Sequence, residues 1–177
     1  MSLSDLKTSR RGLLKLVAGT SLAGALSGLS ACGFTPAYAP GGPAARLYGR
    51  TALPEPNSEE SYQLIRELEQ RLGQTQVADY ALDLSLVLSE GRLAVNAAND
   101  TTRFRVSGKL TYHLNDAEGT EITSGEVTSF TGYSATGTTV ATQSAKADAH
   151  ARLVVILADL LMTRLIAEMP PVPSART

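Results

Sequence analysis

Residues 103–115 read RFRVSGKLTYHLN, with apolar and polar positions in strict alternation apart from one glycine. Its even positions, from Phe104 to Leu114, hold apolar or aromatic residues and one glycine, whereas its odd positions, from Arg103 to Asn115, hold polar or basic residues. A period of two is typical of a strand that buries one face and exposes the other. The stretch therefore predicts a half-buried strand.

A second alternating stretch precedes this strand. Residues 80–89 place tyrosine or leucine at each even position and small, polar or acidic residues at most odd positions. We expect a bend at Glu90-Gly91-Arg92, a continuation of the strand over residues 93–95 and a turn over residues 96–100. The two stretches therefore predict neighbouring antiparallel strands.

A third strand is expected over residues 120–131, after a turn at residues 115–119. Ile122 and Val127 have opposite parity, so their side chains would point to opposite faces of a regular strand. We therefore expect a β-bulge near Ser124-Gly125, where one extra residue returns both side chains to one face. The three strands together form an antiparallel meander.

Two segments outside the meander have the apolar spacing of helices. The first covers residues 58–72, where Asn57 and Glu60 have the spacing of a capping box and Gly73 fits the helix end. Its apolar face consists of Ile65, Leu68 and Leu72, flanked by Leu64. We therefore expect this helix to bury one face.

The second helix is expected over residues 140–168, and three prolines after residue 169 stop it. Its apolar residues recur at gaps of four and three: Ala147, Ala151, Val154, Ala158, Leu161 and Leu165. Four more residues widen this face: Leu153, Ile156, Leu157 and Leu160. The pattern predicts a long helix packed on a broad apolar surface.

Residues 44–53 add a short candidate strand, which Pro54 and Pro56 end. The expected order is therefore strand, helix, strand, strand, strand, helix. Two apolar helix faces need a surface to cover, and one face of a single sheet provides it. The sequence predicts an α+β fold, with two helices on one face of a four-stranded, mostly antiparallel sheet, in one domain over residues 44–169.

The first 31 residues differ in charge from the rest of the chain. They carry four basic residues against Asp5 alone, whereas the whole chain has a net charge of −1. Residues 13–31 are apolar but are interrupted by glycine, serine and threonine. A basic start and a modest apolar stretch that ends in small residues are typical of a secretory signal. We therefore expect residues 1–31 to be a signal peptide.

Ser9-Arg10-Arg11-Gly12 within this signal resembles the motif of the twin-arginine export route. The alternative is that the two arginines are the charged start of an ordinary secretory signal. The sequence leaves both export routes open.

Leu29-Ser30-Ala31-Cys32 resembles the bacterial lipobox. We expect cleavage between Ala31 and Cys32, and attachment of diacylglycerol and palmitate to Cys32. By resemblance to lipoprotein sorting, Gly33 after the cysteine favours the periplasmic face of the outer membrane. Residues 32–43, rich in glycine and proline, predict a lipidated tether, and residues 170–177 predict a disordered tail.

The composition excludes several classes of function. A net charge of −1 argues against a nucleic-acid binder, and the single cysteine excludes a disulfide framework and a cysteine-based zinc site. His113 and His150 have no nucleophile at a motif spacing, and we interpret both as exposed polar residues. No phosphate-binding loop or metal-ligand spacing occurs. We therefore expect no enzyme, no metal and no cofactor besides the lipid on Cys32.

Four basic side chains share the polar face of the central strand: Arg103, Arg105, Lys109 and His113. One interpretation is a surface for phosphorylated lipid headgroups or a partner, since arginine pairs with phosphate through two hydrogen bonds. The other is a solvent-exposed face whose charges pair with Asp83 or Glu126 on neighbouring strands. Both remain open, and Arg103, Arg105 and Lys109 are the candidate ligand or partner site.

The lipobox, the following Gly33-Phe34-Thr35-Pro36 and the element order together resemble the lipopolysaccharide-assembly lipoprotein family LptE. Residues 130–137, before the alanine-rich helix, resemble the alphaproteobacterial branch of that family. The resemblance covers the mature chain and implies a two-layer α/β roll. It also implies contact with lipopolysaccharide (LPS) and a partner, the outer-membrane β-barrel LptD, which the lipoprotein plugs from the periplasmic side.

The expected function is therefore that of a noncatalytic subunit of the LPS export machine. The alternative is an outer-membrane lipoprotein of another envelope pathway, such as barrel assembly or cell-wall attachment. The sequence has no obvious peptidoglycan-binding motif, which favours the first function.

Overall fold

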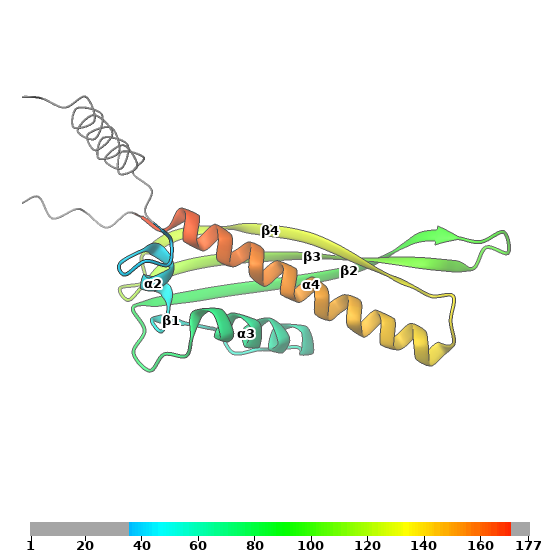
Figure 1. Cartoon of the computed structure of the whole chain (residues 1–177), viewed down its shortest axis with the longest axis horizontal. Coiled ribbons are helices and arrows are strands. Elements are labelled where there is room, and N and C mark those ends of the chain that lie inside the picture. Colours follow the sequence, from blue (N-terminus) through cyan, green and yellow to red (C-terminus); the bar gives the residue numbers. More distant parts are fainter. Residues whose placement is uncertain (1–35, 171–177) are drawn as a thin grey trace, which may run out of the picture. The chain divides into compact units, whose positions relative to one another are not determined.

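The computed structural model describes residues 36–170, and the predicted signal peptide and Cys32 lie outside the described residues. The helices and strands all belong to the compact unit that begins at Ala37. In chain order (Figure 1) they are α2 (Pro43–Leu47), β1 (Thr51–Ala52), α3 (Glu59–Leu72), β2 (Tyr80–Val95), β3 (Thr101–Asp116), β4 (Glu121–Ser134) and α4 (Thr139–Glu168).

The four strands form one mixed sheet in the order β1-β2-β3-β4. Long antiparallel ladders join β2 to β3 and β3 to β4, whereas β1 is parallel to β2 and pairs only with Tyr80 and Ala81. α4 lies over β3 and β4, and α3 packs beside α4 on the same face (Figure 1). The predicted α+β fold is confirmed, with α2 as an additional helix.

The alternation of the central strand is confirmed residue by residue. The buried residues of β3 are Val106, Gly108, Leu110, Tyr112 and Leu114, all at even positions. Gly108 lets α4 approach closely, because a Cβ atom at this position would lie 2.8 Å from Leu157 Cδ1. The apolar face of the meander therefore faces the helices, and the polar face points away from them.

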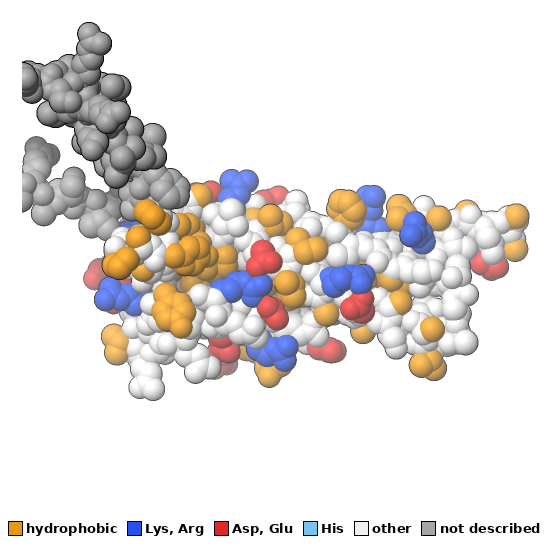
Figure 2. Space-filling model, viewed as in Figure 1, with side chains coloured by type: hydrophobic (Ala, Val, Ile, Leu, Met, Phe, Trp, Pro, Cys, Tyr) orange, Lys and Arg blue, Asp and Glu red, His pale blue; other side chains and the backbone are white. Residues whose placement is uncertain are grey.

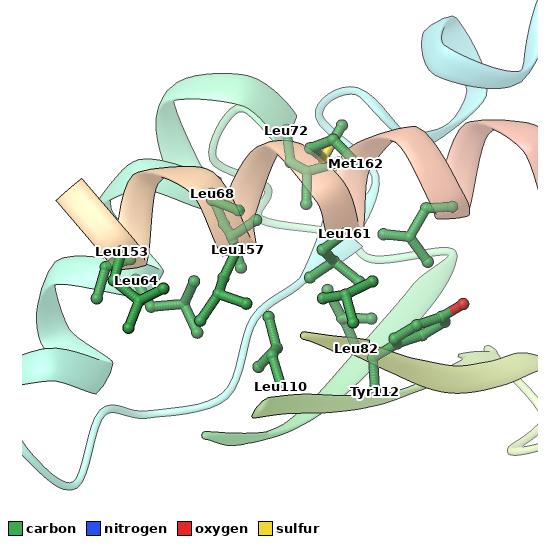
Figure 3. Close-up of a cluster of buried hydrophobic side chains, with 14 of the residues drawn as sticks. Leu64, Leu68, Leu72, Leu82, Leu110, Tyr112, Leu153, Leu157, Leu161 and Met162 are labelled. Carbon is green, nitrogen blue, oxygen red and sulfur yellow. The ribbon is translucent and has the colours of Figure 1, made fainter. Parts of the chain in front are cut away.

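The core lies between the sheet and the two long helices (Figure 3). Leu157 and Leu161 of α4 point from the helix towards Leu110 and Leu82 of the sheet. α3 contributes a stripe of one residue per turn: Leu64, Leu68 and Leu72. No helix within residues 36–170 is long and apolar enough to cross a membrane.

The predicted strand over residues 44–53 is mostly wrong. Residues 43–47 form the helix α2, and only Thr51 and Ala52 form a strand. Pro43 stands at the start of α2, where its fixed φ suits a helix, and the alanines that follow favour helix over strand. Leu47 anchors this helix because its side chain is fully buried.

The predicted cap of the first long helix is also wrong, by one residue. Ser58, not Asn57, is the N-cap of α3. The Ser61 amide donates to Ser58 Oγ at 3.1 Å, and the Ser58 amide donates to Ser61 Oγ at 2.8 Å. The capping box therefore uses Ser61 in place of Glu60, because the serine hydroxyl can accept from the N-cap amide as a carboxylate would.

The β-bulge is present in β4 but not at Ser124-Gly125. Leu114 pairs with Thr123 and Asn115 pairs with Glu121, so Ile122 is the extra residue. Gly125 stays in register because it faces the ring of Tyr112, and a Cβ atom there would lie 2.9 Å from Tyr112 Oη. The bulge instead allows Ile122 to pack against the core.

The expected continuation of the strand over residues 93–95 is confirmed, because β2 runs on to Val95 with its first register shift between Arg92 and Ala94. In α4 the expected burial of Val154, Ala158, Leu161 and Leu165 is confirmed. Ala147 is exposed, however, and Ile156 and Leu160 remain 37% and 38% exposed. These three lie outside the helix face that Leu153 and Leu157 turn to the sheet.

Leu161→Asp should destabilise the fold by about 3 kcal/mol or more, because it places an unpaired carboxylate in the core. Leu160→Asp is the matched control, one residue along the same helix but 38% exposed, and should cost less than about 1 kcal/mol. Urea unfolding followed by circular dichroism measures both. Equal losses in the two variants would show that the helix face is assigned wrongly.

Glu168, the last residue of α4, joins the helix to the sheet. Its Oε2 accepts hydrogen bonds from Tyr112 Oη at 2.7 Å and from Thr123 Oγ1 at 2.8 Å. These two hydrogen bonds hold the pKa of Glu168 below its ordinary value. Burial, with the hydrogen bond to Glu168, raises the pKa of Tyr112 to about 12. At neutral pH an ionised Glu168 therefore faces a neutral tyrosine.

This arrangement predicts an acid-dependent contribution to stability. Because the pKa of Glu168 is lower in the folded chain, its stabilisation is present above the ordinary value of 4.5 and is lost as the pH falls through the folded value. Glu168→Gln should cost about 1 kcal/mol near neutral pH and less near pH 3. Urea unfolding of parent and variant over this range measures the difference, and a difference independent of pH would contradict the assignment.

Candidate functional site

The candidate site is the face of the sheet that points away from the helices. Because α3 and α4 lie on the same face, no element within residues 36–170 covers the other one (Figure 1). The odd positions of β2 and β3 and the even positions of β4 provide its side chains. Polar, basic and a few apolar residues therefore share one solvent-exposed surface, which we call the outer face.

The structure places all four residues of the predicted basic row on the outer face. Lys109 Nζ lies 2.6 Å from Glu126 Oε2, so one of the two expected acidic partners is confirmed. Asp83 lies opposite His113 in the ladder, but it accepts a hydrogen bond from Asn115 Nδ2 at 3.1 Å. Lys109 is therefore paired as the solvent-exposed interpretation expects. Asp83, the other expected partner, binds Asn115 instead of a basic residue.

His113 pairs with a residue that the sequence did not point to. Its Nδ1 lies 2.8 Å from Glu121 Oε2, and this hydrogen bond, with one from Ser124, lowers the pKa of Glu121. The bulge at Ile122 shifts Glu121 along the ladder. With the bulge placed at Ser124-Gly125, as the sequence predicted, the strand register does not predict the contact between His113 and Glu121.

Within the basic row, Arg103 and Arg105 have no carboxylate partner among the described residues, whereas Lys109 and His113 do. The Arg105 guanidinium lies over the ring of Phe130, 4.6 Å from its centroid. Gly91 and Gly132 lie directly opposite Arg105 in the ladder, so neither cross-strand partner has a side chain that could cover it. Arg103 and Arg105 are two residues apart on one face of β3, so their Cα atoms are about 7 Å apart and their guanidinium groups could bind two oxyanions of one ligand.

A shallow hollow of about 620 Å³ is lined in part by Phe130, the residue on which Arg105 stacks. Val87 and Phe130 supply apolar surface and are 58% and 61% exposed. Hydroxyl groups and one ammonium group complete the lining: Ser89, Ser107, Thr128, Ser129 and Lys109. Apolar surface beside cations suits an amphipathic anion. The parity of Phe130, opposite to that of Val127, is the sequence signal that places it on this face.

The distal part of the β2–β3 hairpin is a second exposed feature, and it extends past the start of α4 (Figure 1). Leu93 and Val95 on this ribbon are 51% and 52% exposed. Asn96 holds the turn, since its Oδ1 accepts from the amides of Ala98 at 3.0 Å and Asp100 at 2.9 Å. The hairpin therefore presents apolar side chains on a hydrogen-bonded turn.

His150 is not the exposed helix residue that the sequence suggested, because it lies between the two helices. Its Nδ1 is 3.4 Å from Glu60 Oε1 of α3, and its Nε2 is buried. Lys146, one turn earlier, pairs with Glu90 of β2 at 2.8 Å. Burial raises the pKa of Glu90, but hydrogen bonds from Lys146 and Tyr133 lower it below its ordinary value. The first contact joins α4 to α3, and the second joins α4 to the sheet.

No group of three or more histidine, cysteine, aspartate or glutamate side chains within residues 36–170 could hold a metal ion. The predicted cleavage and lipidation residues, Ala31 and Cys32, lie outside the described part of the chain. The described candidate site is therefore the outer face, with Arg103 and Arg105 as its free cations.

Solved bacterial structures share this fold. A protein described as a lipoprotein from Caulobacter crescentus CB15 is 24% identical, with a TM-score of 0.57 and coverage of 71% of this chain and 96% of that one. For the minor lipoprotein from Acinetobacter baumannii the identity is 17%, the TM-score 0.53 and the coverage 71% and 97%. Rare lipoprotein B from Shewanella oneidensis is 12% identical, with a TM-score of 0.53 and coverage of 67% and 92%. These likenesses show the fold alone.

No curated protein matches the sequence significantly. The model of the family LptE, described as lipopolysaccharide-assembly, matches residues 50–165. This range runs from β1 through the three long strands and most of α4. The chain therefore belongs to the LptE family of lipopolysaccharide-assembly proteins.

Proposed function

We propose that this chain is an outer-membrane lipoprotein of the LPS export machine, anchored through lipid on Cys32 and facing the periplasm. It binds rather than catalyses, as a plug in a partner β-barrel of the LptD type and as a contact surface for LPS. The observation that carries the proposal is the uncovered outer face, where Arg103 and Arg105 have no carboxylate partner among the described residues. Membership of a noncatalytic assembly family supports it.

The chemistry of the outer face fits a phosphorylated lipid. Each guanidinium group can donate two hydrogen bonds to one phosphate, and each charge-assisted contact contributes about 1.5–3 kcal/mol. Phe130 and Val87 beside them offer apolar surface to an acyl chain. A ligand with phosphates and acyl chains therefore satisfies both parts of the surface.

The size of the domain is compatible with a plug. The chain after the predicted signal has a folded radius of gyration of about 15 Å, which suits the lumen of a very large barrel. Inside such a lumen the outer face would meet either the barrel wall or LPS.

Purification of the lipoprotein from detergent-solubilised outer membrane should then recover a stoichiometric large β-barrel. Recovery without a barrel would favour another envelope pathway.

Cys32→Ser should abolish lipid attachment, because serine lacks the thiol that accepts the diacylglyceryl group. We expect an unprocessed or soluble chain that no longer fractionates with the outer membrane. Intact-mass measurement and membrane fractionation test this prediction. If the variant keeps the mature mass and the membrane attachment of the parent, the lipidation assignment is wrong.

Reversing Arg103, Arg105 and Lys109 to glutamate should weaken LPS binding or barrel association at least about tenfold, because three attractive contacts become repulsive. The matched control changes Arg66, Arg152 and Arg164 on the helices to glutamate. It has the same net charge as the outer-face variant but leaves the outer face unchanged. LPS binding and barrel pull-down measure both proteins, and circular dichroism checks folding. If the outer-face variant is folded and equals the control in both assays, the basic row is only a solvent-exposed face.

A further inference from the structure

The described chain begins at an apolar end of the domain. Tyr38 and Tyr48 lie on either side of α2 in the sequence, and their side chains are 78% and 61% exposed. Figure 2 shows hydrophobic side chains gathered over α2 and the C-terminal part of α4. Tyr38 lies within the predicted tether and Tyr48 five residues after its end, and the outer face does not explain why both rings are exposed.

Each tyrosine has the domain close on one side and solvent on the other. Tyr38 lines a groove of about 420 Å³ with Met162 and Ile166 of α4, and the polar part of the lining is Thr163 and the Arg71–Asp159 ion pair. The ring of Tyr48 lies against Gly73, where a Cβ atom would be 3.3 Å from Tyr48 Cζ. The rings therefore extend the apolar surface of this end of the domain.

The two cations beside α2 are already engaged. Arg46 Nη2 donates to the carbonyl of Pro170 at 2.6 Å, and Arg50 pairs with Asp79 at 3.0 Å. Attraction to anionic groups is therefore not the main chemistry of this end. Its contribution comes from apolar and aromatic surface.

The length of chain before Tyr38 limits what this end can face. Cys32 precedes Tyr38 by six residues, which span at most about 21 Å when fully extended. If Cys32 carries the lipid, as the proposed function holds, Tyr38 cannot lie farther than this from the residue whose acyl chains enter the bilayer. The apolar end is therefore held close to a lipid surface.

We propose that Tyr38 and Tyr48 form a membrane-docking surface that inserts into the headgroup region of the bilayer holding the Cys32 lipid. Tyrosine suits this region because its ring is apolar and its hydroxyl is wet. The docking surface needs no anionic lipid, because the neighbouring arginines are engaged within the protein. This inference rests on the proposed lipidation and adds an orientation of the domain to it.

The chain contains no tryptophan, so one introduced tryptophan is an unambiguous fluorescent probe. Tyr38→Trp and Tyr48→Trp are made in the full-length lipoprotein and reconstituted in phosphatidylcholine vesicles with or without brominated acyl chains. The control is Val140→Trp, because Val140 is 76% exposed and lies about 42 Å along α4 from the helix end next to α2. Circular dichroism confirms that each variant is folded.

Brominated acyl chains should lower the tryptophan fluorescence of the Tyr38→Trp and Tyr48→Trp proteins at least about twofold, because tryptophan, like tyrosine, prefers the membrane interface. The Val140→Trp protein should be quenched little, and added salt should change none of these values. Vesicle flotation and intact mass separate the two proposals. A chain that lacks the lipid mass and does not float contradicts the proposed lipidation. A chain that floats but shows equal quenching at all three positions overturns the docking surface alone.

Discussion

Close packing of α4 on Gly108 controls the arrangement of the rest of the domain. With no side chain at this position, Leu153 and Leu157 reach the middle of β3. The helix then lies flat along the sheet, and its fully buried leucines each contribute about 1.5–3 kcal/mol through burial. α3 completes the cover with Leu64, Leu68 and Leu72. Because the apolar residues of the meander alternate so regularly, the described elements cover one face and leave the other open.

That one-sided cover leaves the outer face, the candidate functional surface, exposed. The outer face carries arginines that no described carboxylate neutralises, and only Lys109 and His113 of the basic row have acidic partners. The cation–π contact places Arg105 over Phe130, so a cation and an apolar ring are next to each other on an exposed face. A buried face could not keep unpaired guanidinium groups at such low cost. Covering one face thus leaves the other free for the proposed contact with charged lipid.

The sequence is a reliable guide to features that depend on local pattern. The alternation around Leu110 and the spacing of Leu161 and Leu165 predicted the meander, the long helix and the face that they share. The sequence did not predict features that depend on contacts between distant residues. The bulge lies at Ile122 because Gly125 must face the ring of Tyr112, and the acidic partner of His113 then follows from that shift. The short α2 was missed because a few residues carry little periodicity, and His150 because helix contacts need three dimensions.

The two proposed surfaces lie at opposite ends of β3. Its last residue, Asp116, pairs with Tyr80, and Tyr80 pairs with Thr51 just after α2. Arg103 is thirteen residues from Asp116, a distance of up to about 43 Å along a strand. A bilayer with its headgroups is about 40–45 Å thick. A domain docked by its α2 end, and standing along the axis of a barrel, would therefore carry its free arginines to the opposite membrane face. In that arrangement the docking surface and the free arginines lie at opposite ends of β3, about one membrane thickness apart.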